Sequence, residues 1–169
     1  MRKAKAIRFL SAAAVPALIA AGCSSDECAD NKNSLPLAVV MASLPEPQEA
    51  VLDSISVFGI GAPGDSVLVD SASNVGEFYL PFRIDKGETT YVIRYLQRVI
   101  AEAGTCDTIS FTYDIKPMFV SSACGAVYYY ENVRMGHTTH FIDSITCPGE
   151  RITNANVPNI FIYFRMNED

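Results

Sequence analysis

Short apolar runs recur along most of the chain, separated by Gly, Pro, Asn or Asp. They are rich in Val, Ile, Phe, Tyr and Thr, a pattern typical of β-strands joined by turns. We expect strands at residues 35–42, 54–60, 66–70, 77–84, 89–96, 108–114, 125–131, 138–146 and 159–165. Their number and spacing predict an all-β, immunoglobulin-like sandwich of two antiparallel sheets, with eight or nine strands and braced by disulfides.

Two of these runs indicate which side faces the core. Ile109, Phe111 and Tyr113 share one face of a strand, and polar residues occupy the other face. Both faces are apolar in residues 159–165, which predicts a strand at the centre of its sheet. Residues 61–65 contain two Gly, a Pro and an Asp and predict a hairpin loop.

Residues 91–103 fit two structures. Val92, Tyr95, Leu96 and Val99 also have helical spacing, and Gly104 is suitably placed to end a helix. We favour a strand followed by a turn and keep the helix as the alternative.

The length and charge of the chain limit its function. The 169 residues suit one domain, and the net charge of −6 is opposite to that expected for a nucleic-acid binder. We therefore expect no nucleic-acid partner.

The N-terminal segment has the features of a signal peptide. Basic residues precede the uncharged run at residues 9–21, which is shorter than the roughly 20 apolar residues that span a bilayer. Residues 18–23, LIAAGC, resemble the lipobox of bacterial lipoproteins, which implies cleavage after residue 22 and acylation of Cys23. An ordinary secretory signal is the alternative.

The lipobox implies a particular organisation and location. Residues 1–22 form the signal peptide, residues 23–34 a lipidated tether, and residues 35–169 one β-sandwich domain. Cleavage leaves 9 basic and 19 acidic residues, a net charge of −10. We expect the chain in the cell envelope, bound to the outer membrane through its lipid anchor and either periplasmic or surface-exposed.

The residues directly after Cys23 bear on which leaflet the chain occupies. Residues 24–27, SSDE, resemble the acidic export signal of Bacteroidetes surface lipoproteins, and a solvated pair of charges is the alternative.

The other four cysteines predict two disulfides, because an even count in an exported chain is typical of bridges. If residues 134–137 form the turn of a hairpin, Cys124 and Cys147 face each other across it. Cys28 and Cys106 are left as the second pair.

Five Asp residues are each followed by Ser or Thr and then an apolar residue, which resembles the O-glycosylation sequence of Bacteroidetes. The alternative is structural, because Asp-Ser often closes a turn. The candidate acceptors are Ser54, Ser66, Ser71, Thr108 and Ser144.

Three patterns that suggest chemistry lack the required context. Residues 59–64 match G-x-G-x-x-G, but the β-branched residues after them predict a strand and not the helix of a nucleotide site. His137 and His140 fall on opposite faces of a strand, and the adjacent Asp143 and Ser144 diverge in the same way. We expect no catalytic residue, metal or cofactor.

Tyr128, Tyr129 and Tyr130 form an aromatic cluster. Packing in the core is the favoured interpretation, and stacking on a sugar ring is the alternative.

Six blocks of the chain resemble an uncharacterised family of Bacteroidales lipoproteins that carries a domain of unknown function. The resemblance implies a location and a β architecture, and no activity. The blocks are residues 33–37, 55–61, 78–82, 91–95, 106–109 and 119–125.

Two hypotheses of function follow. The first is a non-enzymatic envelope lipoprotein, whose domain binds or assembles with an envelope protein or glycan. The second is a small glycan-binding module or hydrolase that uses His140, Asp143 and the tyrosine cluster.

Overall fold

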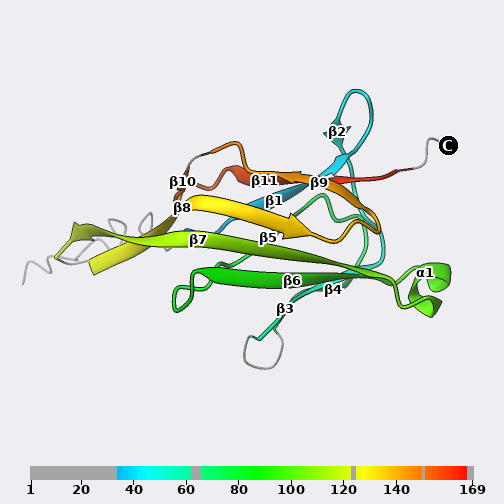
Figure 1. The fold of residues 1–169 in the computed structure, drawn as a ribbon, viewed down its shortest axis with the longest axis horizontal. Coiled ribbons are helices and arrows are strands. Elements are labelled where there is room, and N and C mark those ends of the chain that lie inside the picture. The colour runs from blue at the N-terminus through cyan, green and yellow to red at the C-terminus, as the bar shows by residue number, and fades with distance from the viewer. Residues whose placement is uncertain (1–33, 62–65, 123–124, 150, 167–169) are drawn as a thin grey trace, which may run out of the picture.

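Two β-sheets pack face to face in the computed structural model, which describes residues 34–61, 66–122, 125–149 and 151–166 (Figure 1). The elements are β1 (Leu37–Ala42), β2 (Gln48–Glu49), β3 (Ile55–Gly59), β4 (Val67–Ala72), β5 (Glu77–Tyr79), β6 (Glu88–Tyr95), α1 (Arg98–Glu102), β7 (Cys106–Ser121), β8 (Gly125–His137), β9 (Ile142–Thr146), β10 (Arg151–Ile152) and β11 (Pro158–Phe164). No helix among the described residues is long and apolar enough to cross a membrane.

The predicted all-β sandwich is confirmed. One sheet has the order β2-β1-β11-β9, with β5 also paired to β1, and the other has the order β10-β8-β7-β6-β3-β4. All pairs are antiparallel except β1 with β11, which run parallel. These two strands lie far apart in the sequence, so no tight turn forces them to be antiparallel.

The core lies between the sheets and follows the predicted alternation. Ile109, Phe111 and Tyr113 of β7 are buried, and the polar residues between them lie on the outer face. The prediction for residues 159–165 is also confirmed, because β11 lies between β1 and β9. Apolar burial between the sheets stabilises this arrangement.

The ambiguous segment at residues 91–103 contains both predicted structures in succession. Tyr91, Ile93 and Tyr95 alternate into the core as part of β6, and α1 then adds a short helix. Gly104 follows with a φ of 66°, a conformation that glycine adopts without steric cost.

The hairpin predicted around residues 134–137 is wrong. These residues belong to β8, which pairs with β7, whereas β9 lies in the other sheet beside β11. Gly136 is not a turn residue: a Cβ at this position would come within 2.8 Å of Ser110 Oγ. It permits close approach of two strands, and the chain changes sheets only after β8 ends at His137.

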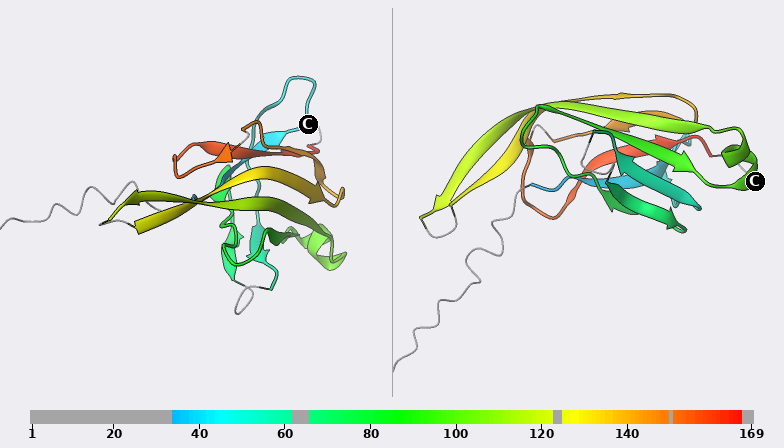
Figure 2. Two further views of the ribbon diagram at one scale, coloured as in Figure 1. Left: turned by 60° about the vertical axis from the view of Figure 1, so that its left-hand side comes forward. Right: turned by 90° about the horizontal axis from the view of Figure 1, so that it is seen from below.

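The β7–β8 hairpin is longer than the sequence predicts. The pairing of β6 with β7 ends at Thr112, and that of β10 with β8 ends at Tyr130. Residues 116–121 of β7 and 125–129 of β8 extend beyond these pairs as a two-stranded projection, here called the arm (Figure 2). Pro117 breaks the strand pattern in the sequence. It is tolerated because the outer edge of β7 has lost its β6 partner there.

Candidate functional site

His140 and Asp143, which the hydrolase hypothesis combines, contact different groups. His140 Nδ1 lies 3.4 Å from Asp107 Oδ1, and the Asp143 carboxylate instead accepts a hydrogen bond from Ser43 Oγ at 2.7 Å. His137 Nε2 is 3.3 Å from the backbone oxygen of Asp143. Each histidine therefore contacts a different group. The partner of His140 is Asp107, which the sequence pattern indicates only as the acid before the candidate glycosylation site Thr108.

Asp107 is the centre of the hydrogen-bond cluster that the sequence analysis missed. It lies at the start of β7 and is fully buried, and both carboxylate oxygens accept hydrogen bonds. Oδ1 accepts from Thr138 Oγ1 (2.7 Å) and the His140 amide (2.9 Å), and Oδ2 accepts from Tyr95 Oη (2.8 Å) and the amides of Phe141 (2.8 Å) and Ile142 (3.3 Å).

These hydrogen bonds determine the ionisation of the cluster. Burial on its own would raise the pKa of Asp107, but the hydrogen bonds from Thr138, Phe141, Tyr95 and His140 outweigh burial and lower the pKa. Burial, followed by the hydrogen bond and charge of Asp107, raises the pKa of Tyr95. The carboxylate therefore stays charged and the phenol stays protonated. Four of its five donors come from residues 138–142, so the carboxylate fixes the connection between β8 and β9.

The strand alternation contains a signal for this cluster. Asp107 continues the inward series of Ile109, Phe111 and Tyr113, so a carboxylate falls at a core position. A buried carboxylate needs hydrogen-bond donors, but its sequence position does not say which residues supply them.

Beside the cluster lies a cleft of about 370 Å³ at the α1 end of the sandwich, here called the α1 cleft. Its lining combines apolar side chains with polar groups at Asp53, Gln97 and Arg165, and neither kind of surface dominates. The other lining residues are Val51, Leu52, Ile55, Tyr95, Ile100, Phe141, Phe164 and Met166.

Asp107 positions two residues of this cleft. It holds the hydroxyl of Tyr95 and the amide of Phe141, whose rings pack with centroids 4.6 Å apart. Arg165 is held by Asp143 Oδ1 at 3.4 Å and by the carbonyl of Thr139 at 2.6 Å. The cleft therefore combines a positioned apolar lining with a fixed guanidinium group. It is suited to hold a small apolar group that carries a polar or anionic end.

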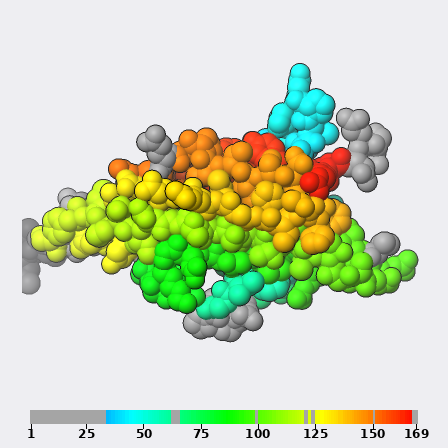
Figure 3. Space-filling model, in the orientation of Figure 1, coloured from blue at the N-terminus to red at the C-terminus, as the bar shows by residue number. Residues whose placement is uncertain are grey.

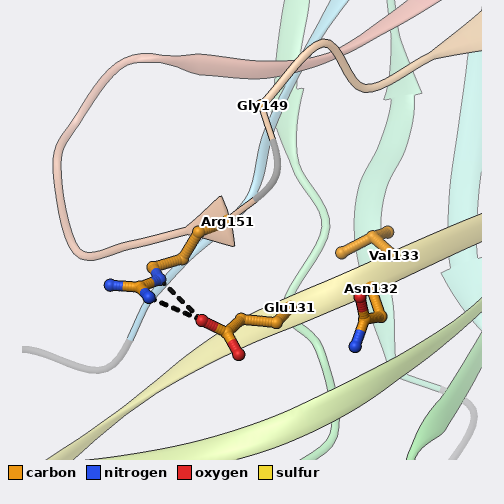
Figure 4. A pocket seen from close by; sticks show the side chains of 5 residues that line it. All are labelled: Glu131, Asn132, Val133, Gly149 and Arg151. Atoms are coloured by element: carbon orange, nitrogen blue, oxygen red, sulfur yellow. Dashed lines mark hydrogen bonds and ion pairs between the residues drawn. The ribbon is translucent and has the colours of Figure 1, made fainter.

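A second hollow, of about 940 Å³, lies where β10 pairs with β8 and is strongly polar (Figure 4). Arg151 reaches Glu131 Oε1 through both Nη2, at 2.6 Å, and Nε, at 2.9 Å. Its other described lining residues are Asn132, Val133 and Gly149. Arg151 and Glu131 neutralise each other, and the lining of this hollow is more polar than that of the α1 cleft, so it offers less apolar surface to a ligand.

The tyrosine cluster divides between two environments. Tyr130 is buried and donates to the Phe82 carbonyl at 3.2 Å, as the core interpretation predicts. Tyr129 carries the Arg151 guanidinium 4.5 Å above its ring centre. The cluster lies on the arm side of β8, whereas His140 and Asp143 follow the other end of that strand. The structure therefore does not bring the tyrosines and these two residues to one site.

The G-x-G-x-x-G match is not a nucleotide loop. Gly59 ends β3, Gly61 has a φ of 70°, and the next described element is β4, paired antiparallel to β3. This agrees with the predicted hairpin. The described residues contain no group of three or more His, Cys, Asp or Glu that is placed to hold a metal ion.

The five candidate glycosylation sites differ in exposure. Ser66 and Ser71 are exposed, whereas Ser54, Thr108 and Ser144 are half-buried. The acid that precedes Thr108 is the fully buried Asp107.

The cysteines and the lipobox are only partly described. Among the described residues, Cys106 and Cys147 form no disulfide. Their predicted partners, Cys28 and Cys124, lie outside the described residues, as do Cys23 and the whole signal peptide. The hairpin that favoured pairing of Cys124 with Cys147 is absent, so this pairing stays a prediction without that geometric argument.

Comparison with known proteins gives a family and no activity. No curated protein and no solved structure matches the chain. A family model described as a family of unknown function, DUF6452, matches residues 54–164, from just before β3 to the end of β11. This match covers well over half of the chain, and the protein therefore belongs to the DUF6452 family.

Proposed function

We propose that this chain is a Bacteroidales cell-envelope lipoprotein, anchored to the outer membrane through acylated Cys23, that acts as a non-enzymatic binding module. The observation that carries the proposal is the position of Ser34, where the described chain begins. Its amide and hydroxyl both donate to the Tyr128 carbonyl, at 3.0 and 2.9 Å.

Ser34 and the α1 cleft lie at opposite ends of the molecule, which supports an anchor on the side away from the cleft. β7 begins at Cys106, close after α1, and ends at Ser121, a length of roughly 50 Å for its 16 residues. Tyr128 lies on β8 opposite Pro117, near the far end of β7. Figure 1 shows α1 and the far end of β7 at opposite ends of the molecule. A chain anchored through residues 23–34 would therefore present the α1 cleft away from the membrane.

Binding is favoured over catalysis because the polar groups near the cleft already have partners. Asp107 is surrounded by donors, and Arg165 contacts both Asp143 and Thr139. A general base needs a lone pair that reaches the substrate, and a nucleophile needs a free base beside it. The apolar lining and the fixed guanidinium instead suit recognition of a small amphipathic group.

Lipidation is tested in the native organism by metabolic labelling with a radioactive fatty acid and by intact mass of the purified protein. We expect label and acyl mass on the wild-type chain, and neither on Cys23→Ser. An unlabelled wild-type chain that retains its leader would contradict the anchor.

Binding in the cleft is tested with anilinonaphthalene sulfonate, a fluorescent probe with an apolar body and one anionic group. We expect wild-type protein to enhance its fluorescence and Ile100→Glu, in the cleft lining, to lose most of that enhancement. Ile84→Glu changes an exposed isoleucine outside the lining and is the matched control. Equal loss in both variants would contradict a site at this cleft.

A further inference from the structure

The tip of the arm presents large apolar side chains on both of its faces. Phe119 is 71 % exposed and Met118 is 42 % exposed, and adjacent residues of a strand point to opposite faces. Phe119 lies opposite the exposed Ala126, whereas Met118 lies opposite the buried Val127, so the face that carries Phe119 is the more open one. The arm projects beyond the sandwich at one end of the molecule (Figures 2 and 3).

The charge of the arm differs from that of the rest of the chain. Residues 115–130 contain no Asp or Glu, although the whole chain has 19, and Lys116 is their one basic residue. Tyr128 and Tyr129 lie half-buried at the base of the same segment, whereas Tyr130 is buried in the core. Apolar and tyrosine side chains with a lysine suit the boundary between lipid headgroups and acyl chains, whereas carboxylates would be repelled by anionic headgroups.

The start of the described chain lies next to the arm. Ser34 is bonded to Tyr128, which is three residues, or roughly 10 Å, from Gly125 near the tip. Residues 24–33 join Cys23 to Ser34, and a chain of this length spans at most about 36 Å. A lipid on Cys23 and the tip of the arm are therefore able to meet the same membrane surface.

We propose that the arm inserts Phe119 and Met118 into the headgroup region of the bilayer that holds the lipidated Cys23. This inference rests on the proposed lipid anchor. The lack of carboxylates in the arm and the position of Ser34 beside it favour lipid over a protein partner. The acyl chains on Cys23 and the tip of the arm would then contact the membrane at two points, and two contacts restrict how the domain can rotate on its surface.

The chain contains no Trp, so a single substitution supplies a specific probe. In Phe119→Trp we expect the emission to shift to shorter wavelength on vesicles of phosphatidylethanolamine and phosphatidylglycerol, and to be quenched by lipids with brominated acyl chains. Val67→Trp on β4 is the matched control, because Val67 is 57 % exposed at the opposite edge of the same sheet. Its emission should remain that of Trp in water.

The arm can be tested without natural acylation. The full mature chain, with a histidine tag in place of the lipid on Cys23, is held on the same vesicles by a nickel-chelating lipid. Quenching of Phe119→Trp here supports the arm proposal even if Cys23 proves not to be acylated. Acyl mass on the native protein without quenching at residue 119 would instead preserve the anchor and overturn the arm proposal.

A second variant tests the energetic contribution of the tip. Phe119→Ser should lower the affinity of the tag-free, unlipidated mature chain for vesicles about tenfold, since most of one exposed aromatic side chain is removed from the contact. Val67→Ser should leave this affinity unchanged. If residue 119 stays in water on vesicles but is protected in intact cells, the tip contacts a protein, and the proposal is wrong.

Discussion

Tyr95 Oη donates a hydrogen bond of 2.8 Å to Oδ2 of Asp107, and both residues are buried. The bond joins β6 to β7, the neighbouring strand of the same sheet. The same carboxylate holds the amides of Phe141 and Ile142, where the chain passes to the other sheet. One charged group therefore joins the sheets at the α1 end and also shapes the α1 cleft.

Asp107→Asn should destabilise the protein strongly. Every group that contacts the carboxylate is a donor, so an amide nitrogen placed there would face other donors and leave buried groups unpaired. We expect the free energy of unfolding in urea to fall by about 3 kcal/mol. Asp85→Asn, an exposed carboxylate paired with Arg83, is the control and should change little. Equal effects of the two substitutions would contradict a special role for Asp107.

Stability should depend on acid through the same residue. The pKa of Asp107 is lowered in the folded protein, so its contribution is complete above the unfolded pKa of about 3.9 and is lost as the pH falls through the folded value. We expect urea denaturation from pH 6 down to pH 2 to show a decline that is smaller in Asp107→Asn. A wild-type decline identical to that of the variant would assign acid sensitivity to other carboxylates.

The cysteines should be oxidised in the exported protein. We expect iodoacetamide to leave Cys28, Cys106, Cys124 and Cys147 unmodified unless a reductant is added, as measured by intact mass. Peptide mapping without reduction then identifies the pairs. The predicted partners are Cys124 with Cys147, and Cys28 with Cys106.

If the cysteines prove to be reduced, the structure predicts that they differ in reactivity. If the thiols are free, Cys147 should react slowly, because burial raises the pKa of its thiol and disfavours the thiolate. Rapid, complete labelling of all four cysteines would exclude the disulfides.

Glycosylation, where it occurs, should favour the exposed sites. Ser66 and Ser71 lie exposed, whereas Thr108 is half-buried and follows the inaccessible carboxylate of Asp107. We expect Ser66→Ala or Ser71→Ala to lower the intact mass of the native protein by one glycan. Thr108→Ala should change the mass only by the difference between the side chains. A glycan found on Thr108 would show that the buried acid is no obstacle to the transferase.

The observed strand boundaries show which of them can be predicted from the local alternation of apolar and polar residues. Residues 108–114 alternate so regularly that both faces of that strand follow from the sequence. The extension of β7 through Pro117 does not, because its tolerance depends on the missing β6 neighbour. Gly136 shows the same limit. The sequence suggests a turn, whereas in the structure Gly136 lies in a strand where a Cβ atom would collide with Ser110 Oγ on the adjacent strand.

The sequence by itself determined the β class, most strand positions and the side of each strand that faces the core, because alternation is a property of neighbouring residues. It also contains the lipobox at Cys23, on which the proposed anchor depends. Only the tertiary structure decided that β8 pairs with β7 and not β9, that Asp107 gathers five donors, and that the arm leaves the sheet. Each of these depends on contacts between residues far apart in the chain, and side-chain periodicity carries no information about which distant strands will meet.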